Sequence, residues 1–183
     1  MSKKHRIIFA CGGLLAITLT LVLAGRLLLG EDDTKAEKTI EALGGEVARN
    51  PSVPGKPIIS VYLRNTQVTD ARLKELAGLQ SLQTLYLDGT NVTDTGLKEL
   101  AGLKSLQHLN LAGTKVTDAG LKELAGLKSL QGLSLQTTLV TDVGLKELAG
   151  LKSVQLLNLD GTKVTDAGVE ELRKALPSCT IIH

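Results

Sequence analysis

The chain has 183 residues and a formal net charge of +2, and 43% of its residues are hydrophobic while only 2% are aromatic. This length leaves room for one domain and an N-terminal segment but excludes a second domain of ordinary size, and the core has to consist of leucine and valine. Four basic residues lie in or beside an N-terminal apolar stretch, and the remaining 17 basic and 19 acidic residues lack the basic excess that marks a nucleic-acid-binding protein.

The first 30 residues predict a membrane segment. Residues 7–25 carry no charge, and 19 such residues are about the length that a helix needs to cross a bilayer. Basic residues precede this stretch and Glu31-Asp32-Asp33 comes after it, so the positive-inside rule places the rest of the chain outside the cytoplasm. We interpret residues 1–30 as a signal-anchor. A cleaved signal peptide, with small residues in Val22-Leu23-Ala24, is the alternative, and the protein would then be secreted.

Residues 31–57 predict a cap helix and a linker. Thr34-Lys35-Ala36-Glu37 fits a helix capping box, Ile40 and Leu43 supply an apolar stripe, and Gly44-Gly45 ends the predicted helix. A short strand over residues 46–50 and a proline-rich turn over 51–57 come next. We expect this cap helix and linker to cover the N-terminal end of the domain formed by residues 58–183.

A 24-residue unit recurs through that domain. Val-Thr-Asp appears in register, beginning at Val68, Val92, Val116, Val140 and Val164. Within a unit, apolar residues first alternate, as at Leu85 and Leu87, and then recur every three residues, as at Leu97, Leu100 and Leu103. Each unit therefore predicts a strand and a short helix joined by turns. A unit this short cannot bury an apolar face alone, so the copies must stack into a solenoid with one continuous core.

The spacing Leu82-x-x-Leu85-x-Leu87-x-x-Thr90-x-Val92 resembles the leucine-rich repeat. Val-Thr-Asp-x-Gly-Leu resembles the bacterial and F-box-associated subset with 24-residue units. Over residues 58–183 the resemblance implies an α/β fold, a leucine-rich repeat solenoid with a curved parallel sheet on the concave side, short helices on the convex side and about five repeats between terminal caps. There is no F-box, so the ubiquitin-ligase role of some similar repeats is not implied.

The chain departs from the family at one repeated position and at its last unit. Threonine stands where the family commonly has asparagine, so hydroxyls would replace a buried amide ladder, at Thr66, Thr90, Thr114, Thr138 and Thr162. The last unit has one additional residue within 172–176, which predicts a C-terminal cap.

Two further repeated columns have a structural interpretation and a chemical one. The aspartates of the Val-Thr-Asp motifs are interpreted as helix caps, together with the threonines before them, rather than as a ladder of calcium ligands. The glycines at 96, 120, 144 and 168 are interpreted as close-packing positions rather than a phosphate-binding loop, because Arg72 occupies the same position in the first unit. We therefore expect no catalytic, metal or cofactor site, no small-molecule substrate and no enzymatic activity.

Residues that vary between units point outward from the concave sheet face. The register brings Tyr62 beside Tyr86, Arg64 beside Asp88, and His108 beside Thr84 in the neighbouring column. The candidate site for a protein or peptide partner, whose identity the sequence does not give, consists of Tyr62, Arg64, Tyr86, Asp88, His108 and Asn110. The alternative interpretation is that these cross-strand pairs only stabilise the sheet.

The fourth unit is irregular. Thr137 stands where other units have glycine or asparagine, so we expect a different turn there because a β-branched residue resists the left-handed conformation. Leu139 replaces polar residues, and a local repacking is favoured over a second contact site. Two functions remain open: a membrane-tethered interaction module outside the cytoplasm, and a structural protein of the cell envelope or a secreted protein without a ligand on the concave face.

Overall fold

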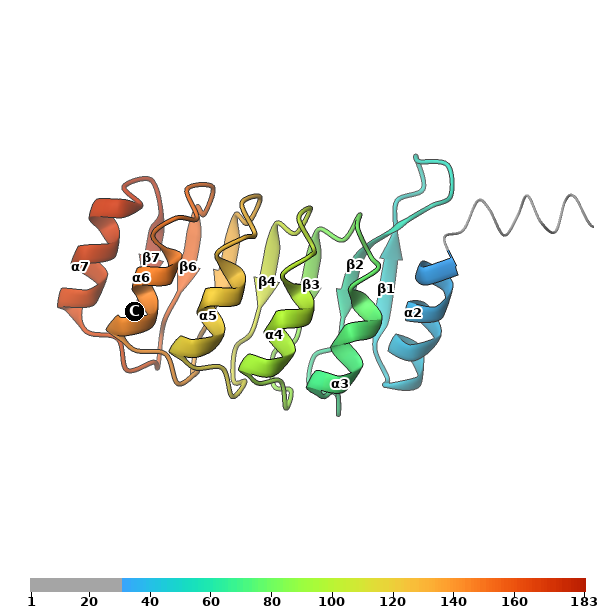
Figure 1. Ribbon diagram of the computed structural model, residues 1–183, viewed down its shortest axis with the longest axis horizontal. Helices are drawn as coiled ribbons and strands as arrows, with labels where there is room; N and C mark the ends of the chain where they lie inside the picture. The colour runs from blue at the N-terminus through green and yellow to red at the C-terminus, as the bar shows by residue number, and fades with distance from the viewer. Residues whose placement is uncertain (1–30) are drawn as a thin grey trace, which may run out of the picture.

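A computed structural model describes residues 31–183. Its helices stand side by side along one side of a single sheet, from α2 at one end of the row to α7 at the other (Figure 1). The predicted signal-anchor, including residues 7–25, lies outside the described residues. Within 31–183, none of the helices is both long and apolar enough to cross a membrane.

Strands and helices alternate along the chain. Seven strands form one sheet in sequence order, with β2 to β7 parallel and β1 antiparallel to β2. This arrangement confirms the α/β solenoid predicted from the 24-residue unit. The elements are α2 (Glu31–Ala42), β1 (Glu46–Arg49), β2 (Ile58–Tyr62), α3 (Asp70–Leu73), the 3-10 turn η2 (Lys74–Leu76), β3 (Thr84–Tyr86), α4 (Asp94–Leu100), β4 (His108–Asn110), α5 (Asp118–Leu124), β5 (Gly132–Ser134), α6 (Asp142–Leu148), β6 (Leu156–Asn158), α7 (Asp166–Ala175) and β7 (Thr180–Ile182).

The core between the sheet and the helices consists of stacked leucine and valine side chains. Each coil places its equivalent residues in register with the next, so that Leu85 pairs with Leu109 and Leu109 with Leu133. Both predicted spacings are confirmed, because the alternating and the every-third leucines are all buried. Burial of this column, at roughly 25 cal/mol per Å² of apolar surface, is the main source of stability in a chain with so few aromatic residues.

The buried threonines close turns within their own coils. Thr90, Thr114 and Thr138 are each 4% exposed, and their hydroxyls donate to the carbonyl oxygen three residues earlier, with Oγ1 to O distances of 2.6 Å. The hydroxyl therefore satisfies one carbonyl in its own coil and makes no contact with the next coil. The links between coils have to come from other groups.

The strongest repeated link is a bridge from an aspartate to the threonine of the following coil. Asp94 Oδ1 accepts from Thr117 N at 2.8 Å and its Oδ2 accepts from Thr117 Oγ1 at 2.6 Å. The same two bonds join Asp70 to Thr93, Asp118 to Thr141 and Asp142 to Thr165. The prediction for threonine is confirmed for α4 to α7, where for example Thr117 Oγ1 also accepts from Ala119 N and caps α5. It is wrong for α3, where the Thr69 side chain makes no cap bond. The prediction for aspartate is wrong, because its carboxylate binds the next coil rather than its own helix.

This bridge explains the glycine column. A methyl group on Gly120 would overlap Asp94 Oδ1, and one on Gly96 would overlap Asp70 Oδ1. Consecutive helices therefore approach closely where the carboxylate crosses between them, as the close-packing interpretation predicted. Arg72 is tolerated in α3 because it faces α2, whose Asp33 bonds Ile58 N and not the threonine at the start of α3. The first coil is also the least regular, with a four-residue helix that continues as a 3-10 turn.

After α4, α5 and α6, at the C-terminal end of the helix, a lysine contacts the following coil. Lys104 Nζ donates to Gly126 O at 3.3 Å, Lys128 Nζ to Gly150 O at 3.2 Å, and Lys152 Nζ to Ala175 O at 2.9 Å. These ammonium groups lie at the negative end of the helix dipole, where a cation is favoured. Each of these three coils is thus fixed to the next coil at both ends of its helix.

Helix α2 and strand β1 cover the first coil. Ala36 and Ile40 of α2 are buried in the common core. The guanidinium of Arg49 in β1 bonds Glu37 Oε2 at 2.7 Å, and this bond raises the pKa of Arg49. Lys35 pairs with Glu75 at 2.7 Å, which lowers the pKa of the Glu75 carboxyl. The capping box predicted at Thr34 is wrong, because α2 already includes Glu31 and Thr34 lies within the helix.

The fourth coil keeps the regular turn. Thr137 adopts φ +52, and its N–H donates to Asp160 O at 2.8 Å, as Gly113 N donates to Gln136 O in the coil before. The expectation of a different turn is therefore wrong, because the hydrogen bonds between coils outweigh the local preference of a β-branched residue. Leu139 is 51% exposed, and its N–H keeps the regular bond to Val116 O.

The bridge and the glycine are coupled, so the effect of one substitution should depend on the other. Gly120→Ala alone should destabilise the protein, because the new methyl group overlaps the Asp94 carboxylate. In an Asp94→Ala background the same change should be neutral or stabilising, since alanine favours a helix over glycine by about 1 kcal/mol. Denaturant unfolding of the wild type, both single variants and the double variant should give an interaction free energy of about 0.5–3 kcal/mol.

Arg72→Ala is the matched control, because it lies at the same helix position without a preceding bridge. It should change the free energy of unfolding by less than about 0.5 kcal/mol. Additive effects at Asp94 and Gly120 would contradict the coupling.

Candidate functional site

The outward-facing side chains of β2 to β7 and of the residues directly after each strand form a surface that we call the sheet face. Parallel register places residues 24 positions apart in neighbouring strands, as with Tyr62 and Tyr86 or Thr84 and His108. Because the inward positions hold the core leucines, only the outward positions are free to differ between coils. The outward side chains that distinguish one coil from another therefore lie on this face.

Two tyrosines and an arginine form a stack on the sheet face. The rings of Tyr62 and Tyr86 lie 5.4 Å apart between centroids at an interplanar angle of 11°. The Arg64 guanidinium lies 3.8 Å from the Tyr86 centroid, and its Nε is 3.5 Å from Asp88 Oδ1. Asp88 Oδ1 also accepts from Asn110 Nδ2 at 3.1 Å. The structure thus brings together five of the six predicted site residues, which we call the tyrosine patch: Tyr62, Arg64, Tyr86, Asp88 and Asn110.

The tyrosine patch combines a flat aromatic surface with a nearly neutral charge pair. Tyr62 is 36% exposed and the Arg64 side chain 49% exposed. The guanidinium is held over one ring by cation–π attraction and beside one carboxylate by ion pairing, so its position is fixed before any partner arrives. Pre-organised groups lose less conformational entropy on binding than mobile ones.

His108, the sixth predicted residue, belongs to a different feature of the sheet face. Its ring lies over Gly132, where an added Cβ would come 2.9 Å from His108 Nδ1. Beyond the ring is an open hollow of about 230 Å³, lined by Tyr86, His108, Asn110, Gly132, Ser134, Leu156, Asn158 and Ile182. Leu156 and Ile182 are each 47% exposed. We call this feature the Gly132 hollow.

Sequence reasoning missed the Gly132 hollow. Leu156 lies in the outward column of the repeat and Ile182 in the last strand, and neither belongs to the predicted site. The signal was present, because Gly132 has no side chain in a column where the other coils carry Ser60, Thr84, His108, Leu156 and Thr180.

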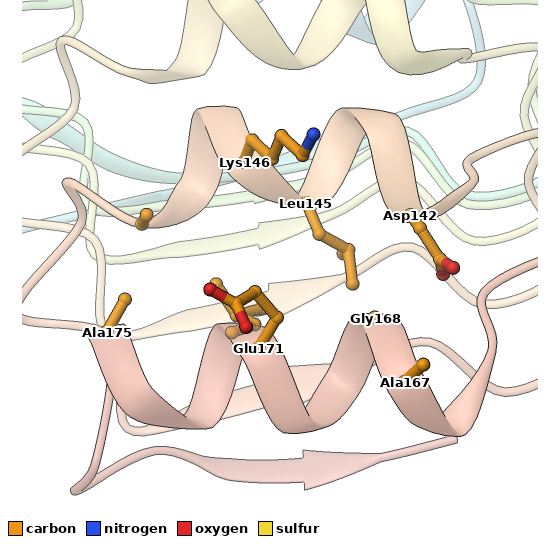
Figure 2. A pocket seen from close by; sticks show the side chains of 9 residues that line it. Asp142, Leu145, Lys146, Ala167, Gly168, Glu171 and Ala175 are labelled. Carbon is orange, nitrogen blue, oxygen red and sulfur yellow. The ribbon is translucent and has the colours of Figure 1, made fainter.

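A second cavity, of about 430 Å³, lies on the helix side between α6 and α7. Figure 2 shows Leu145 pointing from α6 toward α7, with Asp142, Lys146 and Glu171 at the rim. It forms where α7 departs from the repeat, since α7 has ten residues instead of seven and Thr165 Oγ1 accepts from Gly168 N. Leu145 and Leu172 are only 2% and 3% exposed, and Ala149, Ala167 and Ala175 also line the cavity, so its surface is mainly apolar.

The shifted pKa values of Asp142 and Cys179 have structural causes. Asp142 has a lowered pKa because Thr165 donates two hydrogen bonds to its carboxylate. Burial raises the pKa of the Cys179 thiol, which disfavours the nucleophilic thiolate. Within residues 31–183, no three His, Cys, Asp or Glu side chains converge to hold a metal ion.

Comparisons with known proteins agree with this architecture. Residues 58–116 match the family model described as leucine rich repeat. Among curated protein sequences, none is significantly similar to this chain.

Three solved structures illustrate the similarity. A Leptospira interrogans leucine-rich repeat protein is 33% identical over 60% of this chain with a TM-score of 0.49, and the chain spans only 27% of that protein's length. Internalin C2 of Listeria monocytogenes is 20% identical over 87% of this chain and 85% of its own, with a TM-score of 0.47. The ectodomain of the Arabidopsis thaliana receptor kinase SOBIR1 is 14% identical over 84% of this chain and 92% of its own, with a TM-score of 0.55. The fold is therefore a leucine-rich repeat solenoid.

The carboxylate of Asp88 should hold the tyrosine patch in its observed geometry. Asp88→Ala removes the acceptor for Arg64 and Asn110, so the guanidinium should leave the Tyr86 ring. We expect the NMR signals of Arg64 Nε–H and of both tyrosine rings to shift. The free energy of unfolding should fall by about 1 kcal/mol or less, because the pair is partly solvated.

Asp160→Ala is the matched control for this measurement. Asp160 comes after the strand β6 as Asp88 comes after β3, but its carboxylate accepts from Gln136 and contacts no tyrosine. The tyrosine signals should stay in place in this variant. Unchanged tyrosine signals in Asp88→Ala would show that the carboxylate does not position the stack.

Proposed function

We propose that this chain is a membrane-tethered module that binds a protein or peptide outside the cytoplasm through its sheet face, without enzymatic activity. The observation that carries the proposal is the solvent-accessible stack of Tyr62 and Tyr86 with Arg64 over the second ring. The protein has only two tyrosines, and both lie in this stack.

Residue chemistry supports binding by the tyrosine patch. Tyrosine and arginine are enriched among interface residues whose removal costs the most binding energy, because each buries a large surface with few lost torsions. A stack that served the sheet alone would need only the contact between the two rings. Here the polar groups of Arg64, Asp88 and Asn110 surround the rings, which resembles the mixed apolar and polar make-up of an interface.

The dimensions of the face favour a peptide over a large globular partner. Six parallel strands at about 4.8 Å spacing extend over roughly 25 Å, and each contributes about three outward residues. A standard stable interface buries roughly 800 Å² per partner, so a globular partner would also have to contact the loops. An extended peptide fits the sheet face alone.

The location rests on the N-terminal sequence. Residues 7–25 are uncharged and long enough to cross a bilayer, and the basic residues before them favour an external position for the repeats. The Val-Thr-Asp-x-Gly-Leu pattern supports assignment to the bacterial and F-box-associated subset with 24-residue units. The same N-terminal segment would direct secretion if it were cleaved.

Partner capture tests the sheet-face site. The full chain, tagged after His183 and purified in detergent, should capture a specific extracytoplasmic protein, identified by mass spectrometry. Tyr62→Ala/Tyr86→Ala should reduce that capture at least tenfold, which corresponds to about 1.4 kcal/mol of binding energy. Leu139→Ser, which changes an exposed leucine away from the sheet face, is the control and should capture normally. Equal capture by all three proteins, or none, would favour a structural role.

Protease access tests the tether. In intact bacterial cells whose outer envelope is made permeable, an added protease should degrade the C-terminal tag while a cytoplasmic marker survives. The full-length mass should remain in the membrane fraction of untreated cells. Release of a shorter chain into the soluble fraction would instead show signal cleavage and secretion.

A further inference from the structure

The Gly132 hollow breaks an otherwise filled column of the sheet face. In that column all the remaining coils carry a side chain, and the two neighbours of Gly132 are His108 and Leu156. Gly132 contributes no atoms beyond the backbone, and the His108 ring lies over it, so this ring and the strand β5 together form the floor of the hollow. An extended ligand can therefore place one side chain against the His108 ring.

The walls of the hollow are apolar on two sides. Leu156 and Ile182 border it toward the C-terminal end of the sheet, and each leaves about half of its surface in water. The rings of Tyr86 and His108 border it toward the other end. A volume of about 230 Å³ is below the roughly 300–1,000 Å³ of typical small-molecule pockets, so the space suits a single inserted side chain.

Unused hydrogen-bond donors lie among these apolar walls. Asn158 Oδ1 accepts from Asp160 N at 2.9 Å, which fixes the amide and leaves its Nδ2 without a partner among residues 31–183. The Ser134 hydroxyl likewise has no partner within the described chain. Donors beside an apolar hollow suit the carbonyl oxygens of a peptide backbone.

The charge beside the hollow is negative. Asp160 is exposed, and its carboxylate accepts from Gln136 Nε2 at 3.0 Å but forms no ion pair with any described residue. Asp88, in the same column of the sheet face, is paired with Arg64. Asn158 lines the hollow, and Asp160 comes two residues later, beyond the end of β6. Alternate residues of an extended peptide are separated by roughly 6.6 Å, so a peptide residue at the hollow places the residue two positions on toward Asp160.

We propose that the sheet face recognises an extended peptide with an aliphatic residue and a basic residue two positions apart. The aliphatic side chain fills the Gly132 hollow between Leu156 and Ile182, and the basic side chain pairs with Asp160. Asn158 and Ser134 donate to the peptide carbonyl oxygens. This inference rests on the proposed function, because it names the class of partner for the same face.

Labelled peptides test this specificity with the full chain. The probes are fluorescein-labelled nonapeptides of glycine and serine that carry Leu-x-Lys, Lys-x-Leu, Ser-x-Lys or Leu-x-Glu at the centre. Both leucine–lysine orders are included because the peptide can run in either direction along β6. Fluorescence anisotropy, at concentrations up to the order of 1 mM, should show at least tenfold tighter binding of one leucine–lysine peptide than of the serine or glutamate peptides.

Two substitutions in the protein separate the two halves of the site. Gly132→Val adds a side chain that displaces the His108 ring and narrows the hollow, so it should weaken binding of the preferred peptide at least tenfold while leaving the preference for lysine over glutamate. Asp160→Lys should reverse the preference to glutamate while leaving the preference for leucine over serine. Thr84→Val, in the same column as Gly132 but outside the hollow, should leave all affinities within twofold, and circular dichroism should show that each variant is folded.

The outcomes distinguish this inference from the proposed function. If no peptide binds selectively, or if Gly132→Val and Asp160→Lys bind as the wild type does, the aliphatic–basic specificity is wrong. In that case the captured partner can still depend on Tyr62 and Tyr86, and the proposed function would stand without this inference. If the peptides fail and the tyrosine variant also captures normally, both are wrong.

Discussion

The carboxylate bridge between consecutive coils is the interaction on which the rest of the solenoid depends. Asp94 accepts both the backbone N–H and the hydroxyl of Thr117, while that hydroxyl oxygen accepts from the first turn of α5. One carboxylate therefore fixes the distance between two helices and the start of the second one. The close approach requires a glycine, here Gly120, and a repeat length of 24 residues returns each aspartate to the same place. The bridge from Asp142 to Thr165 is kept at α7, and the cavity between α6 and α7 lies where the last helix is longer than the others.

Much of this could be predicted from the sequence, because a fixed period converts sequence offsets into spatial neighbours. Residues 24 positions apart had to lie in adjacent strands, so the contacts of Tyr62 with Tyr86 and of Arg64 with Asp88 could be derived from the register. The direction of the aspartate bridge could not, since a carboxylate at a helix start has donors available in its own coil and in the next. Only the spatial arrangement of the two coils decides between them.

The other errors have related causes. Thr137 keeps a left-handed backbone because hydrogen bonds to the next coil hold it there, and a local propensity cannot report that restraint. Helix α2 includes Glu31, although the capping box at Thr34 predicted a later start. The Gly132 hollow was missed because the predicted site consisted of side chains that could bind a partner, whereas the signal was a glycine in an outward column.

The repeated framework leaves the sheet face as the surface on which the coils differ. Since leucines and valines occupy the inward positions, and bridges and glycines the edge positions of most coils, much of the sequence variation lies on the sheet face. That face is divided into a tyrosine patch, where Arg64 neutralises Asp88, and a Gly132 hollow, beside which Asp160 pairs with no cation of the described chain. Tyr86 borders both, since its ring contacts Arg64 and also lines the hollow. A ligand that reached from one feature to the other would therefore contact an aromatic, neutral surface on one side of Tyr86 and an aliphatic, acidic surface on the other.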